Sequence, residues 1–326
     1  MQPTLCGMSR SHLTLAALAT AAVDGLDLAS TTSFGAGGDD QFDSALLTGR
    51  DGRHFVIRVP RNERAEAEQS ADLVALRALG QGIRSRLPFS VSTFIGQTPI
   101  SGTRAIVYEF VYGAKARFDQ LDGGAEGLSA SIGRAIGAIH SLPTSFVADA
   151  GLPVLTAIEC LREAVTVMDR AASTLLVPAA LLGRWERAME DTQLWQFAPT
   201  VINGSLGAES FLTANGDAAL EVTGLLGWHD LRVGDPARDL SWLIAAGEDV
   251  VASAFSAYGR ANRTHDRLVA DRAQLYAELD VARWLLHGTQ VRSSEIVDDA
   301  VRMLSSIADE AENDMMSALA QGGRAS

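Results

Sequence analysis

The sequence predicts an α+β fold of two lobes, a small N-terminal lobe built on an antiparallel β-sheet and a larger, mainly helical C-terminal lobe. Two patterns support this prediction. Between residues 33 and 112 short strand-like runs alternate with glycine-containing turns around one helical segment, and beyond Gly113 apolar residues recur mostly at helical spacing. A chain of 326 residues with 47% hydrophobic content can bury two such lobes. We place the lobes at residues 1–112 and 113–326.

An apolar run over residues 12–24 predicts a first helix. Its apolar part, residues 13–23, follows Arg10 as the core of a secretory signal would, but it ends in Asp24-Gly25 without a clear cleavage site of small residues. We therefore favour a helix of the N-terminal lobe over a signal peptide. No stretch reaches the roughly eighteen apolar residues that a membrane span needs, so we expect no membrane partner.

The rest of the N-terminal lobe is predicted to hold a hairpin, a helix and two more strands. Strand-like runs at residues 42–48 and 54–59 are separated by a glycine-containing turn, which predicts an antiparallel hairpin. Leucines at three- and four-residue spacing predict a helix over residues 62–80. Two further strands are expected at residues 90–97 and 103–111.

The C-terminal lobe is predicted to hold a series of helices interrupted by one hairpin. An apolar stripe at helical spacing over residues 128–139 predicts a long helix, which Pro143 ends. Further helices are expected at residues 154–170, 178–191, 236–246, 250–260, 267–288 and 293–318. The hairpin lies within residues 201–230, because Asn215-Gly216 suits the positive φ angles of a tight turn and has apolar runs on both sides.

The net charge and the cysteine content limit the classes of binding partner and the cellular compartment that we expect. The formal net charge of −13 opposes binding to nucleic acid phosphates and favours the approach of a cationic small molecule. Nearly all basic charge is arginine, because Lys115 is the only lysine. The two cysteines, Cys6 and Cys160, show no zinc-ligand spacing, which favours a reducing, cytoplasmic setting. Nothing in the sequence indicates the oligomeric state.

Residues 201–243 have the layout of a phosphotransferase active site. Phosphoryl transfer needs a base near the acceptor hydroxyl and groups that hold metal ions on the phosphates. In kinase catalytic loops the base Asp precedes a metal-binding Asn by five residues, and a second metal-binding Asp follows later. This chain has Ser205 and Ser210 at that spacing, and Gly227 follows its hairpin. The spacing of these positions is kept, but the base Asp, the metal-binding Asn and the second metal-binding Asp are absent from them.

These motifs resemble the aminoglycoside and macrolide phosphotransferase family, whose fold is similar to that of protein kinases. The family's loop H-G-D-x-x-x-x-N reads here Asn203-Gly204-Ser205-Leu206-Gly207-Ala208-Glu209-Ser210, and its later Asp-Trp and GDP-x-x-DL read Gly227-Trp228 and Gly234-Asp235-Pro236-Ala237-Arg238-Asp239-Leu240. The resemblance runs from about Ser33 to Leu243 and implies a protein-kinase-like, two-lobed fold. It puts Ser205 in place of the catalytic base and Asn203 in place of the family's His. Ser210 and Gly227 take the places of two metal ligands.

The N-terminal lobe keeps the family pattern better, so we expect it to be of the nucleotide-binding type. The resemblance implies that the following residues contact ATP: Gly37, Gly38, Arg58, Asp72, Glu109, Phe110 and Val111. The two glycines belong to the loop over the nucleotide, and the last three residues form the hinge beside adenine. Arg58 stands where aminoglycoside kinases carry Lys, and its planar guanidinium differs from a compact ammonium. Asp72 takes the place of a longer Glu that pairs with this cation.

The absence of the family's side chains at Ser205, Ser210 and Gly227 predicts a catalytically degenerate, pseudokinase-like member of the family. Asp and Glu total 40 in the chain, so composition does not explain why acids are absent from these positions. The neutral hydroxyl of Ser205 cannot act as a general base near neutral pH without activation. We therefore expect the cleft to bind ATP or another small ligand, without a Mg²⁺ ion, and to act through binding.

The sequence also allows two other functions. An active ATP-dependent phosphotransferase for small molecules of the macrolide or aminoglycoside type would use displaced acids, namely Glu209 beside Ser210 and Asp230 three residues beyond Gly227. A purely structural interaction module would bind no nucleotide at all. These alternatives differ in whether the protein binds ATP and in whether it turns ATP over.

Overall fold

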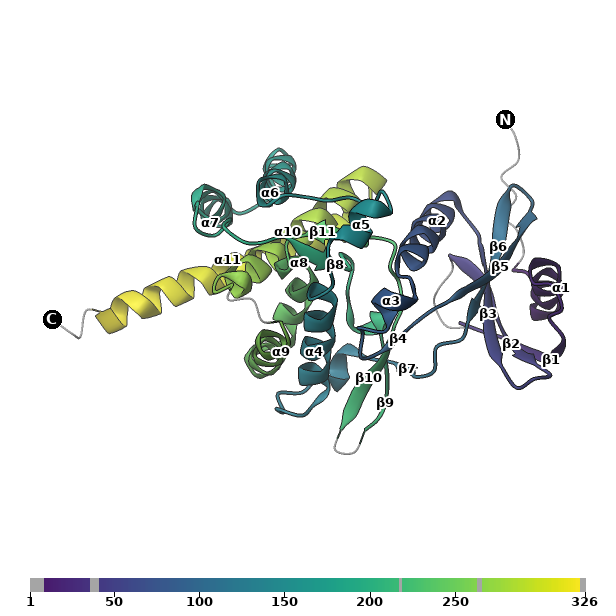
Figure 1. The fold of residues 1–326 in the computed structure, drawn as a ribbon. Helices are drawn as coiled ribbons and strands as arrows, with labels where there is room; N and C mark the ends of the chain where they lie inside the picture. The colour runs from purple at the N-terminus through teal and green to yellow at the C-terminus, as the bar shows by residue number, and fades with distance from the viewer. Residues whose placement is uncertain (1–8, 36–40, 217–218, 263–265, 323–326) are drawn as a thin grey trace.

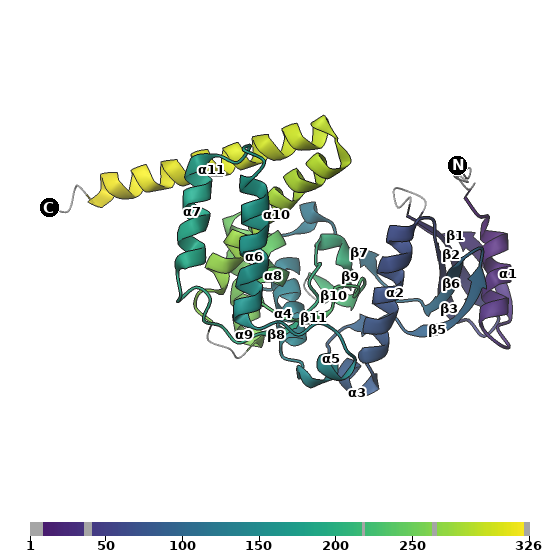
Figure 2. The same ribbon diagram turned by 90° about the horizontal axis from the view of Figure 1, so that it is seen from above.

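The computed structural model describes residues 9–35, 41–216, 219–262 and 266–322, and it describes side chains up to residue 310. Figures 1 and 2 show a small N-terminal lobe, built on an antiparallel sheet, beside a larger helical lobe. The predicted α+β, kinase-like fold with two lobes is confirmed. Within the described residues, none of the helices combines the length and the apolar character that crossing a bilayer requires.

A five-stranded antiparallel sheet forms the N-terminal lobe, in the order β1-β2-β3-β6-β5. Its strands are β1 (Leu28–Ser33), β2 (Phe42–Gly49), β3 (His54–Pro60), β5 (Phe94–Ile100) and β6 (Thr103–Glu109). Helix α1 (His12–Ala22) covers one face of the sheet and helix α2 (Glu63–Ala78) lies against the other (Figure 1). The predicted hairpin and both helices are confirmed, whereas β1 was not predicted.

Helix α1 is fixed at its start by a cap and by an ion pair. The Ser11 hydroxyl accepts a hydrogen bond from the backbone N–H of Thr14, which satisfies one free donor of the first turn. Just before it, the Arg10 guanidinium pairs at 2.9 Å with Asp43, a buried acid at the start of β2. Leu15 and Ala19 then pack into an apolar cluster with the sheet. This apolar run is therefore an integral layer of the N-terminal lobe.

The predicted strand at residues 90–97 is in fact two strands that belong to different sheets. Its first part, β4 (Ser90–Val91), pairs in parallel with β10 (Leu220–Leu225) in a second sheet of order β4-β10-β9-β7, and only the second part is β5. The guanidinium of Arg84 donates hydrogen bonds to the Val91 carbonyl at 3.0 Å and to the Thr93 hydroxyl at 2.9 Å. These bonds hold the bend between the two strands.

The hairpin of β9 (Phe211–Asn215) and β10 is confirmed, but its loop is longer than a two-residue turn. Asn215 pairs with Leu220 in the ladder, and the N–H of Gly216 donates to the carbonyl of Ala219 at 2.8 Å. Asn215 is thus the last residue of a strand rather than a turn residue. Residues 217–218 lie outside the described part.

Every helix predicted for the C-terminal lobe is present. The main helices are α4 (Leu128–His140), α6 (Ala157–Ala172), α7 (Ala179–Glu190), α9 (Glu248–Ala261), α10 (Val269–Val291) and α11 (Ser294–Gly322). Over residues 236–246 the single predicted helix is a short turn, α8 (Ala237–Leu240), followed by the 3₁₀ helix η3 (Ser241–Ala246). Helices α4 and α9 approach closely because α4 carries glycines, and a Cβ at Gly133 would lie 2.1 Å from the Ala254 carbonyl oxygen.

Candidate functional site

One buried carboxylate holds the backbone of the catalytic-loop segment. The loop follows β8 (Thr200–Ile202), which pairs with β11 (Arg232–Gly234). The backbone N–H groups of Asn203 and Gly204 each donate a 2.7 Å hydrogen bond to Asp239, one to each carboxylate oxygen. Hydrogen bonds to a charged acceptor contribute about 1.5–3 kcal/mol each. Asp239 therefore fixes where the loop starts, a role that the sequence did not reveal.

Side chains from α4 and α9 support this anchor in turn. His140 lies 3.2 Å from an Asp239 oxygen through Nε2 and 3.0 Å from the Tyr258 hydroxyl through Nδ1. The side-chain amide of Asn262 donates to the same hydroxyl at 2.7 Å. Burial raises the pKa of Tyr258, so the phenol stays protonated at neutral pH. The loop is thus connected to the centre of the C-terminal lobe by a continuous polar network.

Asn203 brings three of the predicted site positions together. Its side-chain amide donates to the Gly227 carbonyl at 2.8 Å, and its side-chain oxygen accepts from the Ser205 N–H at 3.3 Å. The residue is completely buried. Asn203 therefore ties the loop to the segment beyond the hairpin.

The hydroxyl groups of the two serines form their described hydrogen bonds only within the loop. The Ser205 hydroxyl lies 3.4 Å from the side-chain oxygen of Asn203, and no described carboxylate or imidazole bonds to it. The Ser210 hydroxyl accepts from the Gly207 N–H at 3.2 Å and so closes the 3₁₀ turn η2 (Ala208–Ser210). Neither group is placed beside a base that would activate it.

Gly227 keeps a backbone suited to an acidic side chain. Its φ is +74°, in the left-handed region where Asp and Asn are several-fold enriched over other non-glycine residues. A Cβ added there would have no atom within 4 Å. The space for a side chain is present and the carboxylate is absent.

The acid and the cation predicted for the N-terminal lobe come together with Trp228. The Trp228 N–H donates a 2.7 Å hydrogen bond to the Asp72 carboxylate of α2. Burial raises the pKa of Asp72, while the bond from Trp228 and the nearby charge of Arg58 act in the opposite direction. The Arg58 guanidinium lies over the Phe42 ring at 3.8 Å from its centre. Arg58, Asp72 and the segment after Gly227 thus meet between the lobes.

Phe110 of the predicted hinge belongs to an aromatic cluster whose other members, Phe34 and Tyr112, were not predicted. Phe110 makes edge-to-face contacts with Phe34, at 6.0 Å between ring centres, and with Tyr112, at 5.0 Å. The Glu109 side chain points to a surface ion pair with Arg53 at 3.3 Å, so any contact of Glu109 with a base would use its backbone. Val111 lies against the hairpin, where its side chain would meet a Cβ at Gly224.

Aromatic faces beside a hinge suit a flat nucleobase. The predicted loop residues Gly37 and Gly38 lie outside the described residues.

The two acids considered as substitutes lie in different surroundings. Glu209 is exposed and pairs with Lys115 at 3.5 Å. Asp230 instead packs against the loop, because its carboxylate oxygen would lie 2.7 Å from a Cβ at Gly204. Asp230 also lies 3.6 Å from the Arg232 guanidinium. Of the two, Asp230 is the acid that lies against the loop at Gly204.

The residues at the metal-ligand positions do not fit a divalent cation. Magnesium prefers carboxylate and other oxygen ligands in octahedral geometry. Ser210 offers a hydroxyl already bonded within its loop, and Gly227 offers no side chain. In the part of the chain that the structure describes, no three His, Cys, Asp or Glu side chains gather into a potential metal site.

Solved phosphotransferase structures are similar to this chain over almost its whole length. A macrolide 2′-phosphotransferase type I is 24% identical with a TM-score of 0.69, covering 90% of this chain and 96% of its own. Macrolide 2′-phosphotransferase MphH from Brachybacterium faecium is 19% identical with a TM-score of 0.70, covering 90% and 97%. APH(2″)-IIia, in complex with GDP and kanamycin, is 19% identical with a TM-score of 0.73, covering 92% and 99%. These likenesses establish the fold.

Among curated protein sequences, none matches this chain. The family model of the phosphotransferase enzyme family matches residues 32–285, which is most of the chain. The match includes the loop with Ser205, the hairpin and the anchor Asp239, and it agrees with the resemblance to macrolide and aminoglycoside phosphotransferases. The chain therefore belongs to the phosphotransferase enzyme family.

Proposed function

We propose that this protein is a catalytically degenerate member of its family that binds a nucleotide or another small ligand between its lobes and acts through binding. The proposal rests on one observation: hydrogen bonds hold the backbone of the site in place, but three of its positions carry uncharged residues. Asp239 and Asn203 hold the loop and the segment after the hairpin together, while Ser205, Ser210 and Gly227 supply neither a base nor metal ligands. Loss of these groups removes several kcal/mol of transition-state stabilisation.

Binding of a nucleotide is supported by the N-terminal lobe. Arg58 can contact phosphates, and the aromatic faces at Phe110 and Phe34 can stack on a base. Similar proteins were solved with GDP, as APH(2″)-IIia was, or with ADP, as a spectinomycin phosphotransferase was. We therefore include guanine as well as adenine nucleotides as ligands. We also propose a cytoplasmic setting and, because the net charge is −13, a cationic small molecule as the second ligand.

A thermal-shift titration with ATP, ADP, GTP and GDP, each with and without Mg²⁺, tests the proposal. A ligand at about 100 times its Kd stabilises the folded state by about 2.7 kcal/mol, which is a rise in Tm of roughly 5 °C for a protein of this size. We expect either the adenine or the guanine nucleotides to raise Tm, and by the same amount with and without Mg²⁺. A rise that requires Mg²⁺ would contradict the proposal, and no rise with any nucleotide would favour a structural interaction module.

A second candidate function is an active small-molecule phosphotransferase that uses Asp230. The packing of Asp230 against Gly204 favours it over Glu209 as the acting acid. Its carboxylate is engaged by the Arg232 guanidinium at 3.6 Å, which works against a role as general base. This function predicts Mg²⁺-dependent ATP or GTP turnover that Asp230→Asn abolishes and Glu209→Gln does not.

A further inference from the structure

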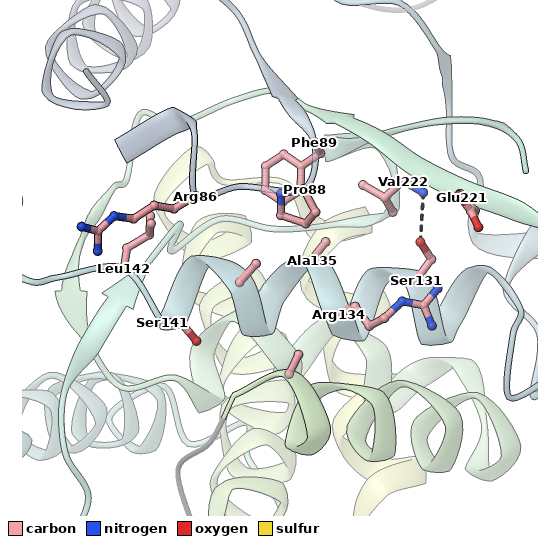
Figure 3. A pocket seen from close by; sticks show the side chains of 12 residues that line it. Arg86, Pro88, Phe89, Ser131, Arg134, Ala135, Ser141, Leu142, Glu221 and Val222 are labelled. Atoms are coloured by element: carbon pink, nitrogen blue, oxygen red, sulfur yellow. Dashed lines mark hydrogen bonds between the residues drawn. The ribbon is translucent and has the colours of Figure 1, made fainter. Parts of the chain in front are cut away.

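A cavity of about 510 Å³ lies away from the residues of the proposed nucleotide site, where the segment between α3 (Gln81–Arg84) and β4 crosses α4 (Figure 3). Pro88 and Phe89 of that segment lie above it, and Ala135 of α4 lies below it (Figure 3). Ala138 of α4 also lines it. Cavities of roughly 300–1,000 Å³ hold small molecules in proteins. None of the described residues that line the cavity belongs to the catalytic loop or the hinge.

Two arginines mark the ends of this cavity. Figure 3 shows Arg86 at one end, beside Leu142, and Arg134 at the other. Neither guanidinium lies within 4.0 Å of a described carboxylate, whereas Arg184, Arg238 and Arg272 of the same lobe are all ion-paired. Two arginines without a described acid partner therefore line one cavity in a chain of net charge −13.

The charges around the Arg134 end balance, because Arg134 and Arg260 face Glu126 and Glu221. An adjoining cavity of about 420 Å³ shares Arg134 with the first and adds Arg260 and Glu126. Glu221 lines the first cavity near Arg134. Arg86 at the far end adds a third arginine, so that three arginines face two glutamates over both cavities. Glu221 lines the first cavity itself, so its charge opposes an anion there, which gives a charge test of known sign.

The cavity also offers a hydroxyl donor. The buried Ser131 hydroxyl accepts a hydrogen bond from the Val222 N–H at 3.0 Å. Because that bond uses the oxygen as acceptor, the hydroxyl hydrogen is left to donate, and it takes no described acceptor. Ser131 and Arg134 lie on successive turns of one face of α4, so both can serve a single anionic group.

We propose that this cavity binds a small amphipathic anion. Its acidic group pairs with Arg134 and Ser131, and its apolar body lies between Phe89 and the alanines of α4, toward Arg86. From Arg134 to Ser141, a cavity-lining residue directly after α4, seven residues at 1.5 Å rise span ~10 Å. An extended chain of about eight carbons has this length. A carboxylate, sulfate or phosphate head group shares the required chemistry.

Calorimetric titration of the full chain with octanoate tests the proposal, with octylamine and octanol as probes of equal body and different head group. We expect octanoate to bind with a stoichiometry of one and at least tenfold more tightly than either other probe. Octyl phosphate tests a phosphate head group and is expected to bind as tightly as octanoate. Octylamine or octanol binding as tightly as octanoate overturns the proposal.

Variants separate this site from general adsorption. Arg134→Ala is expected to weaken octanoate binding at least tenfold, Arg86→Ala to weaken it less, and Glu221→Gln to strengthen it. Arg187→Ala is the matched control, because Arg187 is exposed on α7, outside both cavities and without a described ion pair. Equal weakening by Arg187→Ala, or none by Arg134→Ala, overturns the proposal.

A second variant tests the cavity without changing any charge. Ala138→Leu extends a half-buried side chain into the cavity and keeps a good helix former in α4. We expect it to weaken octanoate binding at least tenfold while the far-UV circular dichroism stays that of the wild type. Unchanged octanoate binding by a folded Ala138→Leu variant overturns the proposal, and it does so even if Arg134→Ala fails to fold.

Discussion

The backbone N–H of Trp228 donates a 2.7 Å hydrogen bond to the carboxylate of Asp72, which connects helix α2 of the N-terminal lobe to the residue after Gly227. The two residues are 156 positions apart in the chain. The bond joins the two lobes at the point where a family member with an acid in place of Gly227 would hold its metal. In this chain the acid that contacts this segment comes from α2.

Asp72 gives the stability of the protein a predictable pH dependence. Because burial raises its folded-state pKa above the ordinary value of 3.8, the folded state holds the proton more tightly than the unfolded state. The Asp72 contribution to stability therefore falls as pH rises from 3.8 toward the folded-state pKa. Asp72→Asn cannot titrate, and its amide oxygen can still accept from the Trp228 N–H.

Urea unfolding at several pH values from about 3 to about 7 measures this effect. We expect the stability of Asp72→Asn relative to the wild type to improve as pH rises across this interval. Asp149→Asn, on an exposed acid without a described partner, serves as the control and should show no such trend. A relative stability of Asp72→Asn that falls with rising pH would contradict the assignment.

The anchor Asp239 should dominate the stability of the loop region. Asp239→Ala leaves the N–H groups of Asn203 and Gly204 buried without an acceptor, at about 1–3 kcal/mol each. We expect a loss of roughly 2–6 kcal/mol in the free energy of unfolding, measured with urea, and a smaller loss for Asp239→Asn. Removing the exposed acid in Asp149→Ala should change stability by no more than about 0.5 kcal/mol. A similar small change for Asp239→Ala would show that the anchor is dispensable.

The close contact of α4 and α9 predicts opposite effects at two glycines. Gly133→Ala puts a Cβ 2.1 Å from the Ala254 carbonyl oxygen, so the helices must separate at a cost of about 1–3 kcal/mol. Gly183→Ala, in α7 with no atom near its Cβ, should instead stabilise the protein by up to about 1 kcal/mol. Denaturant midpoints compare the two variants, and equal shifts would refute the packing argument.

Restoring an acid at Gly227 should introduce metal dependence into nucleotide binding. The space around Gly227 is free, and its positive φ strains Asp less than most other side chains. The added carboxylate would restore an oxygen ligand where the resemblance puts a metal-binding acid. For Gly227→Asp we expect Mg²⁺ to tighten nucleotide binding about tenfold, equivalent to about 1.4 kcal/mol. Gly227→Asn has the same shape without the charge and should remain insensitive to Mg²⁺. Calorimetric titrations with and without metal decide the outcome.

Much of the fold was predictable because the relevant signals are local. The apolar stripe of α4 and the strands of the β2–β3 hairpin follow from residue spacing alone. Strand β1 escaped prediction because its sequence, LASTTS, is polar and lies at the edge of the sheet, where burial imposes no alternation. The division of residues 90–97 depends on Arg84, whose partners are set by tertiary packing.

The site was predictable only in part, for a similar reason. Spacing and resemblance located Ser205, Ser210 and Gly227, because motif order is written in the chain. The roles of Asp239 and Asn203 depend on hydrogen bonds between segments that are distant in sequence. GDP-x-x-DL contained Asp239, but a sequence pattern does not state which backbone groups an acid will meet.

Phosphoryl transfer by the purified wild-type chain is the most direct test of the central claim. The assay supplies ATP or GTP with Mg²⁺ and offers macrolide and aminoglycoside acceptors. Because the chain lacks a base at Ser205 and metal ligands at Ser210 and Gly227, we predict that transfer of the γ-phosphate does not exceed the no-enzyme background. Turnover at about 1–100 s⁻¹, the rate typical of kinases, would show that the site is catalytically competent.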